Sequence, residues 1–351
     1  MARPSPLPAL MARPSGRLPE GRPRIMVGSM KSALRLATAL ALPLVLVPAA
    51  RLRAAPPSMG DPAKVALKTT SVAGNVSMIE GANGFAGGNV AVSVGDDGLF
   101  VIDDELQPMT PKLTAALTAL APKAKVRFVV NTHWHGDHTG GNAGMAAAGA
   151  VIVAHENVRK RLSVAQVIKF MGETHNIPPA PPQALPVVTF ADDVTLYLNG
   201  DEVHVVHVDP AHTDGDAIVH FKKTNIVHTG DTFVSGYPIV DVGSGGRFEG
   251  FIAAADRMLS LCDDATKIIP GHGPVMTKAD LKEWRDMLVT VRDRLKKLIA
   301  QKKTLEQIKA AKLTAEFDGK WGQGMINGDQ LIETAYETRL GPPSKPAAAK
   351  H

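Results

Sequence analysis

Eight consecutive residues decide the fold of this 351-residue chain: Asn131-Thr132-His133-Trp134-His135-Gly136-Asp137-His138. They follow a largely apolar run, residues 126–130, which predicts a buried strand. Four imidazole and carboxylate side chains therefore stand within six residues of a strand-to-loop turn. Such ligands suit zinc, and four of them packed this closely are shared between two adjacent ions more easily than they satisfy one. The segment predicts a dinuclear metal site.

Further motifs surround this segment, and together they resemble the metallo-β-lactamase fold superfamily over about residues 65–274. A strand closed by an acid precedes it, and three short motifs follow it. These stretches are Gly98-Leu99-Phe100-Val101-Ile102-Asp103, Pro210-Ala211-His212-Thr213-Asp214-Gly215-Asp216, Val227-His228-Thr229-Gly230-Asp231 and Pro270-Gly271-His272-Gly273-Pro274. The resemblance implies an α/β fold, an αββα sandwich of the metallo-β-lactamase type with a C-terminal helical extension.

The resemblance also implies how the ligands are divided between two metals. One metal would take His133, His135 and His212; the other would take Asp137, His138 and His272. Asp231 would bridge both ions, and Asp103 and Thr139 would support the ligands from behind. Two zinc ions per chain are expected, with iron or manganese as alternatives. No other cofactor is expected.

The expected reaction is hydrolysis of a small molecule. Two ions about 3.5–4 Å apart lower the pKa of a shared water toward 7 and supply hydroxide at neutral pH. That hydroxide would attack an ester, thioester, lactone or lactam, and Asp137 would act as the catalytic residue that orients water and shuttles the proton. β-Lactam-cleaving members generally have Cys or Ser where this chain has Asp231, which argues against a dedicated β-lactamase.

Other functions stay open. Members with the bridging Asp include thioester hydrolases similar to glyoxalase II, lactonases and exported proteins that share a helical C-terminus. A glutathione thioester would require basic side chains in that extension, but Lys282, Arg285 and Arg292 there also fit the solvated face of an amphipathic helix. β-Lactam hydrolysis, an iron-dependent oxidoreductase such as a sulfur dioxygenase, and a non-catalytic exported binding protein are the alternatives.

The chain divides into five parts by pattern: a signal peptide region (1–49), a Pro-rich linker (50–64), the hydrolase domain (65–277), a helical extension (278–340) and a disordered tail (341–351). Short β-branched runs separated by Gly and Asn predict strands in the hydrolase domain, with a helix over 110–121. Apolar residues three and four apart predict a long amphipathic helix from Asp280, then shorter helices over 305–311 and 329–338.

The basic charge is confined to the N-terminus. Residues 1–49 carry seven Arg or Lys against Glu20 alone, so of the overall formal charge of +5 about −1 is left for the rest of the chain. Nucleic-acid binding is therefore not expected. The apolar run 36–47 behind Lys31 and Arg35 is typical of a secretory signal and shorter than the roughly 20 residues of a membrane span. We expect cleavage near Ala49, a periplasmic or secreted product and no stable membrane anchor; an uncleaved anchor is the alternative.

The remaining distinctive residues have simpler interpretations. Trp134 either lines the substrate pocket or packs beneath the site, and the loop 232–248 after the bridging acid is expected to overhang the metals. Cys262, the single cysteine, is expected to be a small buried residue. His204 and His207 are three apart in a predicted strand and so lie on opposite faces. The oligomeric state cannot be derived from these patterns.

Overall fold

The computed structural model describes residues 61–170 and 172–338. The expected signal region with its cleavage site near Ala49, most of the linker and the tail 341–351 lie outside the described residues. Within the described part of the chain, no helix is both long enough and apolar enough to cross a membrane.

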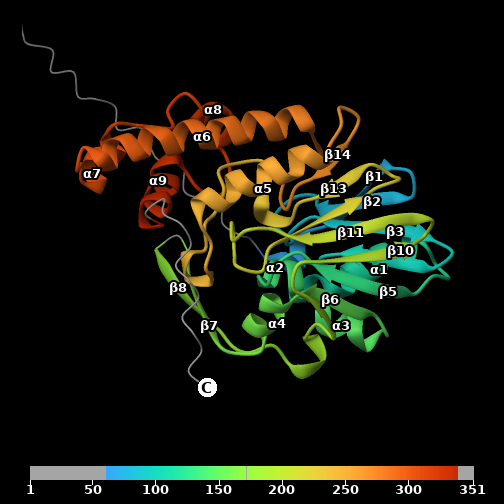
Figure 1. Cartoon of the computed structure of the whole chain (residues 1–351). Helices are drawn as coiled ribbons and strands as arrows, with labels where there is room; N and C mark the ends of the chain where they lie inside the picture. The colour runs from blue at the N-terminus through green and yellow to red at the C-terminus, as the bar shows by residue number, and fades with distance from the viewer. Residues whose placement is uncertain (1–60, 171, 339–351) are drawn as a thin grey trace, which may run out of the picture. The chain divides into compact units, whose positions relative to one another are not determined.

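Two stacked sheets form the centre of the fold (Figure 1). The first has seven strands in the order β1-β2-β3-β4-β5-β6-β9, antiparallel up to β4 and parallel from β4 onward. Its strands are β1 (Leu67–Ala73), β2 (Val76–Gly81), β3 (Val90–Gly95), β4 (Gly98–Ile102), β5 (Val126–Asn131), β6 (Val151–His155) and β9 (Val188–Phe190).

The second sheet has six strands in the order β10 to β15. All neighbours pair antiparallel except β13 and β14, which are parallel. Its strands are β10 (Asp193–Leu198), β11 (Asp201–His207), β12 (Ala217–Phe221), β13 (Ile226–His228), β14 (Lys267–Ile269) and β15 (Met276–Thr277). The strands of this sheet lie in sequence order, and most neighbours are joined by short connections. The parallel pair β13 and β14 is the exception, because the long connection between them contains α5.

Apolar side chains hold the sheets together. Val76, Phe100 and Val130 from the first sheet share one buried cluster with Val203 and Phe221 from the second. The rings of Phe100 and Phe221 meet edge to face at 6.0 Å. Because side chains alternate along a strand, β11 turns Val203 and Val205 into this cluster and Val206 to its outer face.

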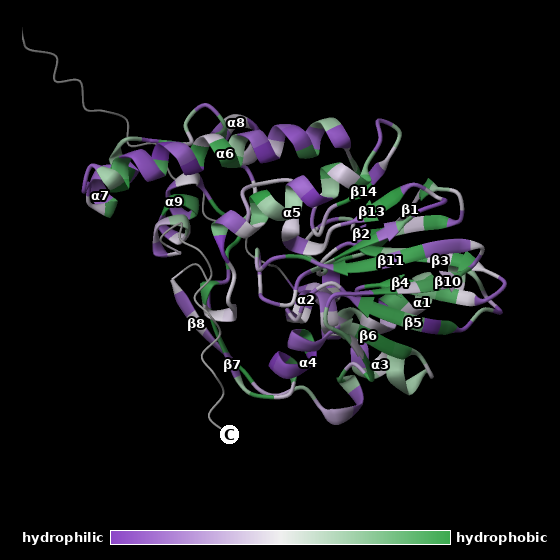
Figure 2. Cartoon of the chain, in the orientation of Figure 1, coloured by the Kyte–Doolittle hydropathy of each residue, from purple (hydrophilic) through white to green (hydrophobic). Residues whose placement is uncertain are grey.

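Helices cover the outer face of each sheet. Helices α1 (Thr110–Leu120) and α3 (Asn142–Ala147) pack on the first sheet through Leu113, Leu117 and Met145. Helices α5 (Phe248–Leu261) and α6 (Lys278–Ala300) pack on the second. Figure 2 shows hydrophobic residues concentrated in the strands and hydrophilic residues along the visible face of α6. The expected αββα sandwich is confirmed.

The C-terminal helices are also confirmed. Helix α6 begins at a capping box in which the Thr277 side chain accepts from the Asp280 N–H and the Asp280 carboxylate accepts from the Thr277 N–H. It is followed by α7 (Leu305–Ala310), α8 (Asp318–Trp321) and α9 (Gly328–Glu337). Trp284 of α6 is fully buried between Phe233 and Phe251, so the extension shares its core with the second sheet.

Several elements were not predicted from the sequence. They are the edge strand β1, helix α4 (Glu156–Leu162), helix α5, and a hairpin of β7 (Gln166–Phe170) and β8 (Glu173–Ile177). The hairpin strands pair with each other and with no further strand among the described residues. Both the hairpin and β1 carry many polar residues, because their outer faces are exposed and nothing forces an apolar pattern on them.

Candidate metal centre

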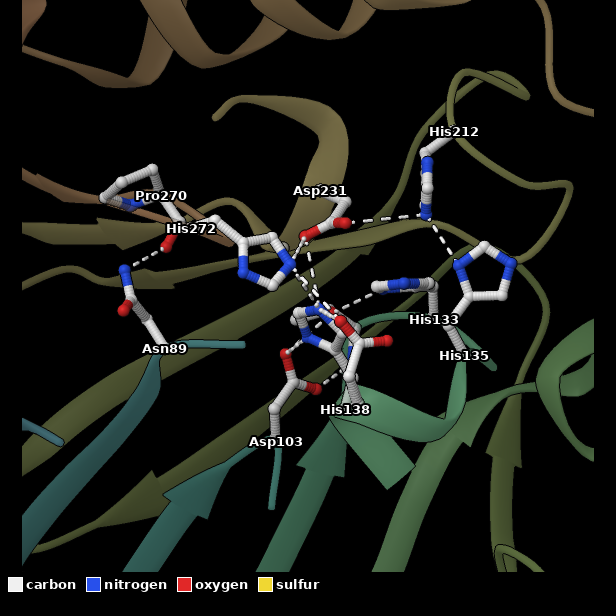
Figure 3. A network of polar contacts seen from close by, with 12 residues as sticks. Asn89, Asp103, His133, His135, His138, His212, Asp231, Pro270 and His272 are labelled. Atoms are coloured by element: carbon white, nitrogen blue, oxygen red, sulfur yellow. Dashed lines mark hydrogen bonds and ion pairs between the residues drawn. The ribbon is translucent and has the colours of Figure 1, made fainter. Parts of the chain in front are cut away.

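The seven residues predicted as ligands lie together at one rim of the sandwich, at the ends of strands from both sheets. Figure 3 labels all of them except Asp137. The turn after β5 carries four of them and the second sheet supplies the rest. From the first sheet come His133, His135, Asp137 and His138; from the second come His212 after β11, Asp231 after β13 and His272 after β14. Three overlapping groups have ligand atoms within 4.8 Å of one another, as a metal site requires.

The first group is His133, His135 and His212. His212 donates from Nδ1 to the Ile239 carbonyl at 2.7 Å, and His135 donates from Nε2 to the Asp241 carboxylate at 2.9 Å. With those protons assigned, His212 Nε2 and His135 Nδ1 face each other with lone pairs only 2.7 Å apart. His133 Nε2 is buried without a hydrogen-bond partner. Converging lone pairs and an orphaned nitrogen fit a divalent cation at this point.

The second group is Asp137, His138 and His272. Asp137 Oδ2 lies 3.3 Å from His272 Nε2 and 3.6 Å from His138 Nε2. His138 is oriented by Asp103, whose Oδ2 accepts from His138 Nδ1 at 2.8 Å. That bond leaves His138 Nε2 as an acceptor, directed at the group's other members. These donors suit a second cation beside the first.

Asp231 joins the two groups. Its Oδ1 lies 3.2 Å from His138 Nε2 and 3.4 Å from His272 Nε2, while its Oδ2 lies 3.5 Å from His212 Nε2. Burial raises the pKa of Asp231, but the neighbouring His272 and His138 more than offset this and hold it well below its usual range. An ionised carboxylate with one oxygen toward each group is what a bridging ligand requires.

Asp103 and Thr139 lie behind the ligands. Besides holding His138, Asp103 accepts from the backbone N–H of Thr132 at 2.7 Å and from its hydroxyl at 2.8 Å. Thr139 donates to the carbonyls of Trp134 and His135, which fixes the turn that carries the ligands. Neither belongs to a group that could hold an ion among the described residues.

Two glycines allow the backbone to pass close to the ligand side chains. A Cβ on Gly88 would lie 2.0 Å from His138 Cε1, and a Cβ on Gly271 would lie 2.0 Å from Asp231 Oδ1. The Gly271 turn is fixed by Asn89, whose amide donates to the carbonyls of Pro270 and Gly273 at 2.8 and 2.7 Å (Figure 3). Only glycine leaves room for the ligands at these two positions.

Two acids that support the ligands were not predicted from the sequence. Asp241 was given no role, yet it holds His135. Asp216 accepts from the backbone N–H groups of His212 and Thr213 and so fixes the turn of the third histidine. His228 accepts from the Gly230 N–H and donates to the Asn89 carbonyl, a hydrogen-bonding role rather than a ligand role. Asp216 stands inside the quoted motif and could have been found there; Asp241 had no local signal.

A cavity of about 270 Å³ opens over Asp137, Asp231 and His272. The loop 232–248 contributes Ile239, Val240 and Asp241 to its wall, as expected for an overhanging segment. Phe233 and Tyr237 of that loop point instead into the core of the extension. Trp134 packs beneath the site against Ala154 and Val158 and does not line this cavity.

Fold and site together define an αββα protein with a cluster of side chains that could hold metal ions at the strand ends. A family model described as the metallo-beta-lactamase superfamily matches residues 84–294. The chain belongs to this superfamily, whose members are generally metal-dependent hydrolases.

Individual relatives are distant. The chain is 25% identical over 179 residues to the 2,4-dinitroanisole O-demethylase subunit alpha of Nocardioides sp. (strain JS1661), and the match spans about half of each protein. Among solved structures it is similar to the DIM-1 metallo-beta-lactamase, with a TM-score of 0.52 and 19% identity over 65% of this chain and 99% of that one. The inverting sec-alkylsulfatase Pisa1 from Pseudomonas sp. gives a TM-score of 0.58 and 20% identity over 79% of this chain and 50% of that one.

Proposed function

We propose that this chain is a hydrolase that holds two zinc ions and cleaves an ester, thioester, lactone or lactam in a small-molecule substrate. One observation carries the proposal: Asp231 directs one oxygen to each of two groups of ligands, and a cavity opens directly above them. Iron or manganese ions are the alternative to zinc for the same ligands.

When bound, two divalent ions lower the pKa of a shared water and polarise the bond to be cleaved. Asp137 supplies the proton transfer. Its side chain is 21% exposed toward the cavity, whereas His138 beside it is fully buried. Burial raises the pKa of Asp137, but His138 and His272 outweigh this and keep its pKa well below the usual range. As a carboxylate it accepts a proton from the attacking water and returns it to the leaving group.

The three histidines of the first group would hold the metal and take no direct part in proton transfer. His133, His135 and His212 each have their outer nitrogen directed at a hydroxyl, carboxylate or carbonyl, at 3.1, 2.9 and 2.7 Å. Such outer contacts fix the ring orientation. The low dielectric of the buried site strengthens every charge interaction with a developing oxyanion in the cavity.

Metal analysis combined with a substrate panel tests the proposal. We expect about two zinc ions per chain and turnover of at least one class among p-nitrophenyl esters, lactones, S-acyl thiols and nitrocefin. In Asp137→Ala we expect turnover to fall by about 10²–10⁴-fold, while Asp264→Ala on the exposed surface has no effect. The zinc content of both variants is measured alongside, because Asp137 is also a ligand candidate.

Two outcomes would contradict the proposal, and a third would narrow its substrate to β-lactams. Less than one ion per chain would remove the basis for metal hydrolysis and favour a binding protein. Iron together with oxygen consumption would indicate an oxidoreductase. Nitrocefin turnover far above that of all other substrates would favour a β-lactamase, against the presence of Asp231 where β-lactam-cleaving members carry Cys or Ser.

We also propose that the protein is exported and acts without nucleic acid or a membrane anchor. The support is the sequence of residues 31–49, with Lys31 and Arg35 before an apolar run and Ala49 at its end. N-terminal sequencing of protein recovered from the periplasm and medium of its host tests this. A mature chain that begins near residue 50 is expected; full-length protein in the cytoplasm would contradict it.

A further inference from the structure

Apart from the candidate ligands, most residues that line the cavity above the metal centre are apolar; Lys169, His175 and Asp241 are the polar exceptions. Its other walls come from segments far apart in the chain, and they carry large aliphatic or aromatic side chains: Phe85, Leu106, Ile168, Ile177, Ile239 and Met325. Phe85 stacks on the ring of His272 with 5.5 Å between centroids. Its volume of about 270 Å³ lies near the lower end of ligand pockets, which run from about 300 to 1,000 Å³. The size favours a small substrate.

Charge is scarce in these walls. Lys169 is the only lysine or arginine among the described residues that line the cavity. Three basic residues of α6 form ion pairs away from the cavity: Lys282 pairs with Asp286, Arg285 with Asp256 and Arg292 with Glu249. None of the three lines the cavity. A substrate carrying several anionic groups, such as a glutathione thioester, would find one cation here.

The β7–β8 hairpin forms one apolar wall. Ile168 and His175 lie opposite each other in the hairpin register and share a face, and both line the cavity. Val167, the neighbour of Ile168, alternates to the other face and is 53% exposed. Met325, between α8 and α9, lines the same cavity, so the C-terminal extension takes part in the site.

We propose that the substrate presents an apolar alkyl or aryl group beside the bond that is cleaved, held between Ile168 of the hairpin and Met325 of the extension, with at most one anionic group. This inference rests on the proposed hydrolase function and names its substrate class. Burial of each methylene in such a cavity raises binding about three- to fourfold. Chain length should therefore govern specificity.

A series of p-nitrophenyl esters from acetate to hexanoate measures this effect. In the wild-type protein we expect kcat/KM for the hexanoate to exceed that for the acetate by about tenfold or more. Ile168→Asn and Met325→Gln should each lower this ratio by about fivefold, because the hexanoyl chain loses more apolar contact than the acetyl group. Val167→Asn, one residue away on the outer face, is the matched control and should leave the ratio unchanged.

Two thioesters with the same acyl group test the charge argument. S-hexanoyl glutathione and S-hexanoyl N-acetylcysteamine differ only in the thiol. We expect similar kcat/KM values for the two, or a preference for the uncharged thiol. A preference of about tenfold or more for the glutathione thioester would overturn the inference, since it would require an anion site that these walls do not offer.

A binding measurement separates this inference from the proposed function. Calorimetry with the zinc-loaded protein compares hexanoate with acetate, with no turnover needed. Tighter binding of hexanoate that is lost in Ile168→Asn but kept in Val167→Asn supports the inference even if no ester is hydrolysed, in which case the proposed function alone fails. Hydrolysis without any dependence on chain length, or equal binding of both acids, overturns the inference and leaves the function intact.

Discussion

His135 is oriented by a carboxylate that lies 106 residues further along the chain. Asp241 is nearly buried, and its own position is fixed by the Ser244 N–H, which donates to Asp241 Oδ1 at 3.1 Å. The contact keeps the proton on His135 Nε2 and turns the Nδ1 lone pair toward His212. A residue outside every motif therefore determines whether the first group can bind an ion.

Replacing this carboxylate should weaken metal binding without breaking the fold. For Asp241→Asn we expect zinc affinity to fall by about 10–100-fold, because the amide retains the shape but not the charge that orients the ring. Competition with a chromophoric chelator measures the dissociation constant. Asp264→Asn on the exposed surface is the control, and an affinity for Asp241→Asn within twofold of wild type would show that His135 needs no such support.

A second prediction concerns Gly88, which leaves the space that the His138 ring occupies. In Gly88→Ala the new methyl would lie 2.0 Å from His138 Cε1, so His138 must move out of the second group. We expect the zinc content to drop by at least one ion per chain, together with a lower Tm. Gly136→Ala lies in the ligand turn itself, where a Cβ meets nothing within 4 Å. It should keep full metal content; equal zinc loss in both variants would contradict the steric argument.

The ligands that could be predicted from the sequence are those that stand in short local motifs. Four of the seven candidate ligands stand within six residues, so their spacing alone identifies them; the other three were predicted from the resemblance of their short motifs to those of the superfamily. Asp241 could not be found, because its only relation to His135 is proximity in the folded chain. Asn89, which fixes the His272 turn from 181 residues away, escaped for the same reason.

Among the elements, β6 and α4 meet at a residue that should make the fold sensitive to acid. His155 ends β6 and accepts the Asn157 N–H as the cap of α4. It stacks on His207 with 3.8 Å between ring centroids. Burial, with His207 alongside, lowers the pKa of His155 to about 4. The ring is neutral in the folded state and takes up a proton more readily once unfolded.

The free energy of unfolding should therefore fall as the pH drops below about 6.5, the pKa of His155 in the unfolded chain. It should continue to fall until about pH 4, by on the order of 3 kcal/mol in total. His155→Asn keeps an oxygen for the cap but cannot be charged. Although less stable at pH 7 because packing is lost, it should show a shallower decline in Tm between pH 7 and 4.5. Both proteins are measured metal-free, and His175→Asn in the hairpin is the control. Parallel declines would rule out His155 as the source.

The elements also show which patterns carry information. Strands β2 to β6 were predicted because both of their faces, or one complete face, are apolar. Helix α5 had a usable signal in Phe248, Phe251, Ala255 and Met258, which recur at helical spacing, but the preceding loop was extended over its start. The β7–β8 hairpin had no such signal, since its apolar residues face a cavity on one side and solvent on the other. The part of the cavity wall that this hairpin forms could therefore not be predicted from the sequence.

In the whole molecule, the helical extension and the second sheet form one packed unit. A single buried cluster includes Val206 and Ile218 of the sheet and Trp284 and Leu331 of the extension. Trp284 also donates from Nε1 to the Gly236 carbonyl at 2.8 Å, in the loop that leads to the cavity wall. The predicted boundary between residues 277 and 278 thus has continuous packing across it.

Trp284 tests how far this unit is cooperative. Trp284→Ala should lower the free energy of unfolding by about 3–5 kcal/mol, as for other large side chains removed from a core. Unfolding in urea is followed with one spectroscopic probe in the second sheet and another in the helical extension. Tyr197→Ala, on the 74% exposed side chain of β10, should change it by less than about 0.5 kcal/mol. Two separate transitions, with only the later helices affected by Trp284→Ala, would contradict a single unit.

The bridging arrangement at the rim has a mechanical consequence for the sandwich as a whole. His133 to His138 belong to the first sheet, while His212, Asp231 and His272 belong to the second, so a bound ion fastens one sheet to the other. The chain has one cysteine and hence no internal disulfide to take that part. Deeper in the sandwich, the Phe100–Phe221 contact joins the same two sheets without any ion. Without metal, the two sheets would separate first at the rim that carries the candidate ligands, while the apolar interior between them stays packed.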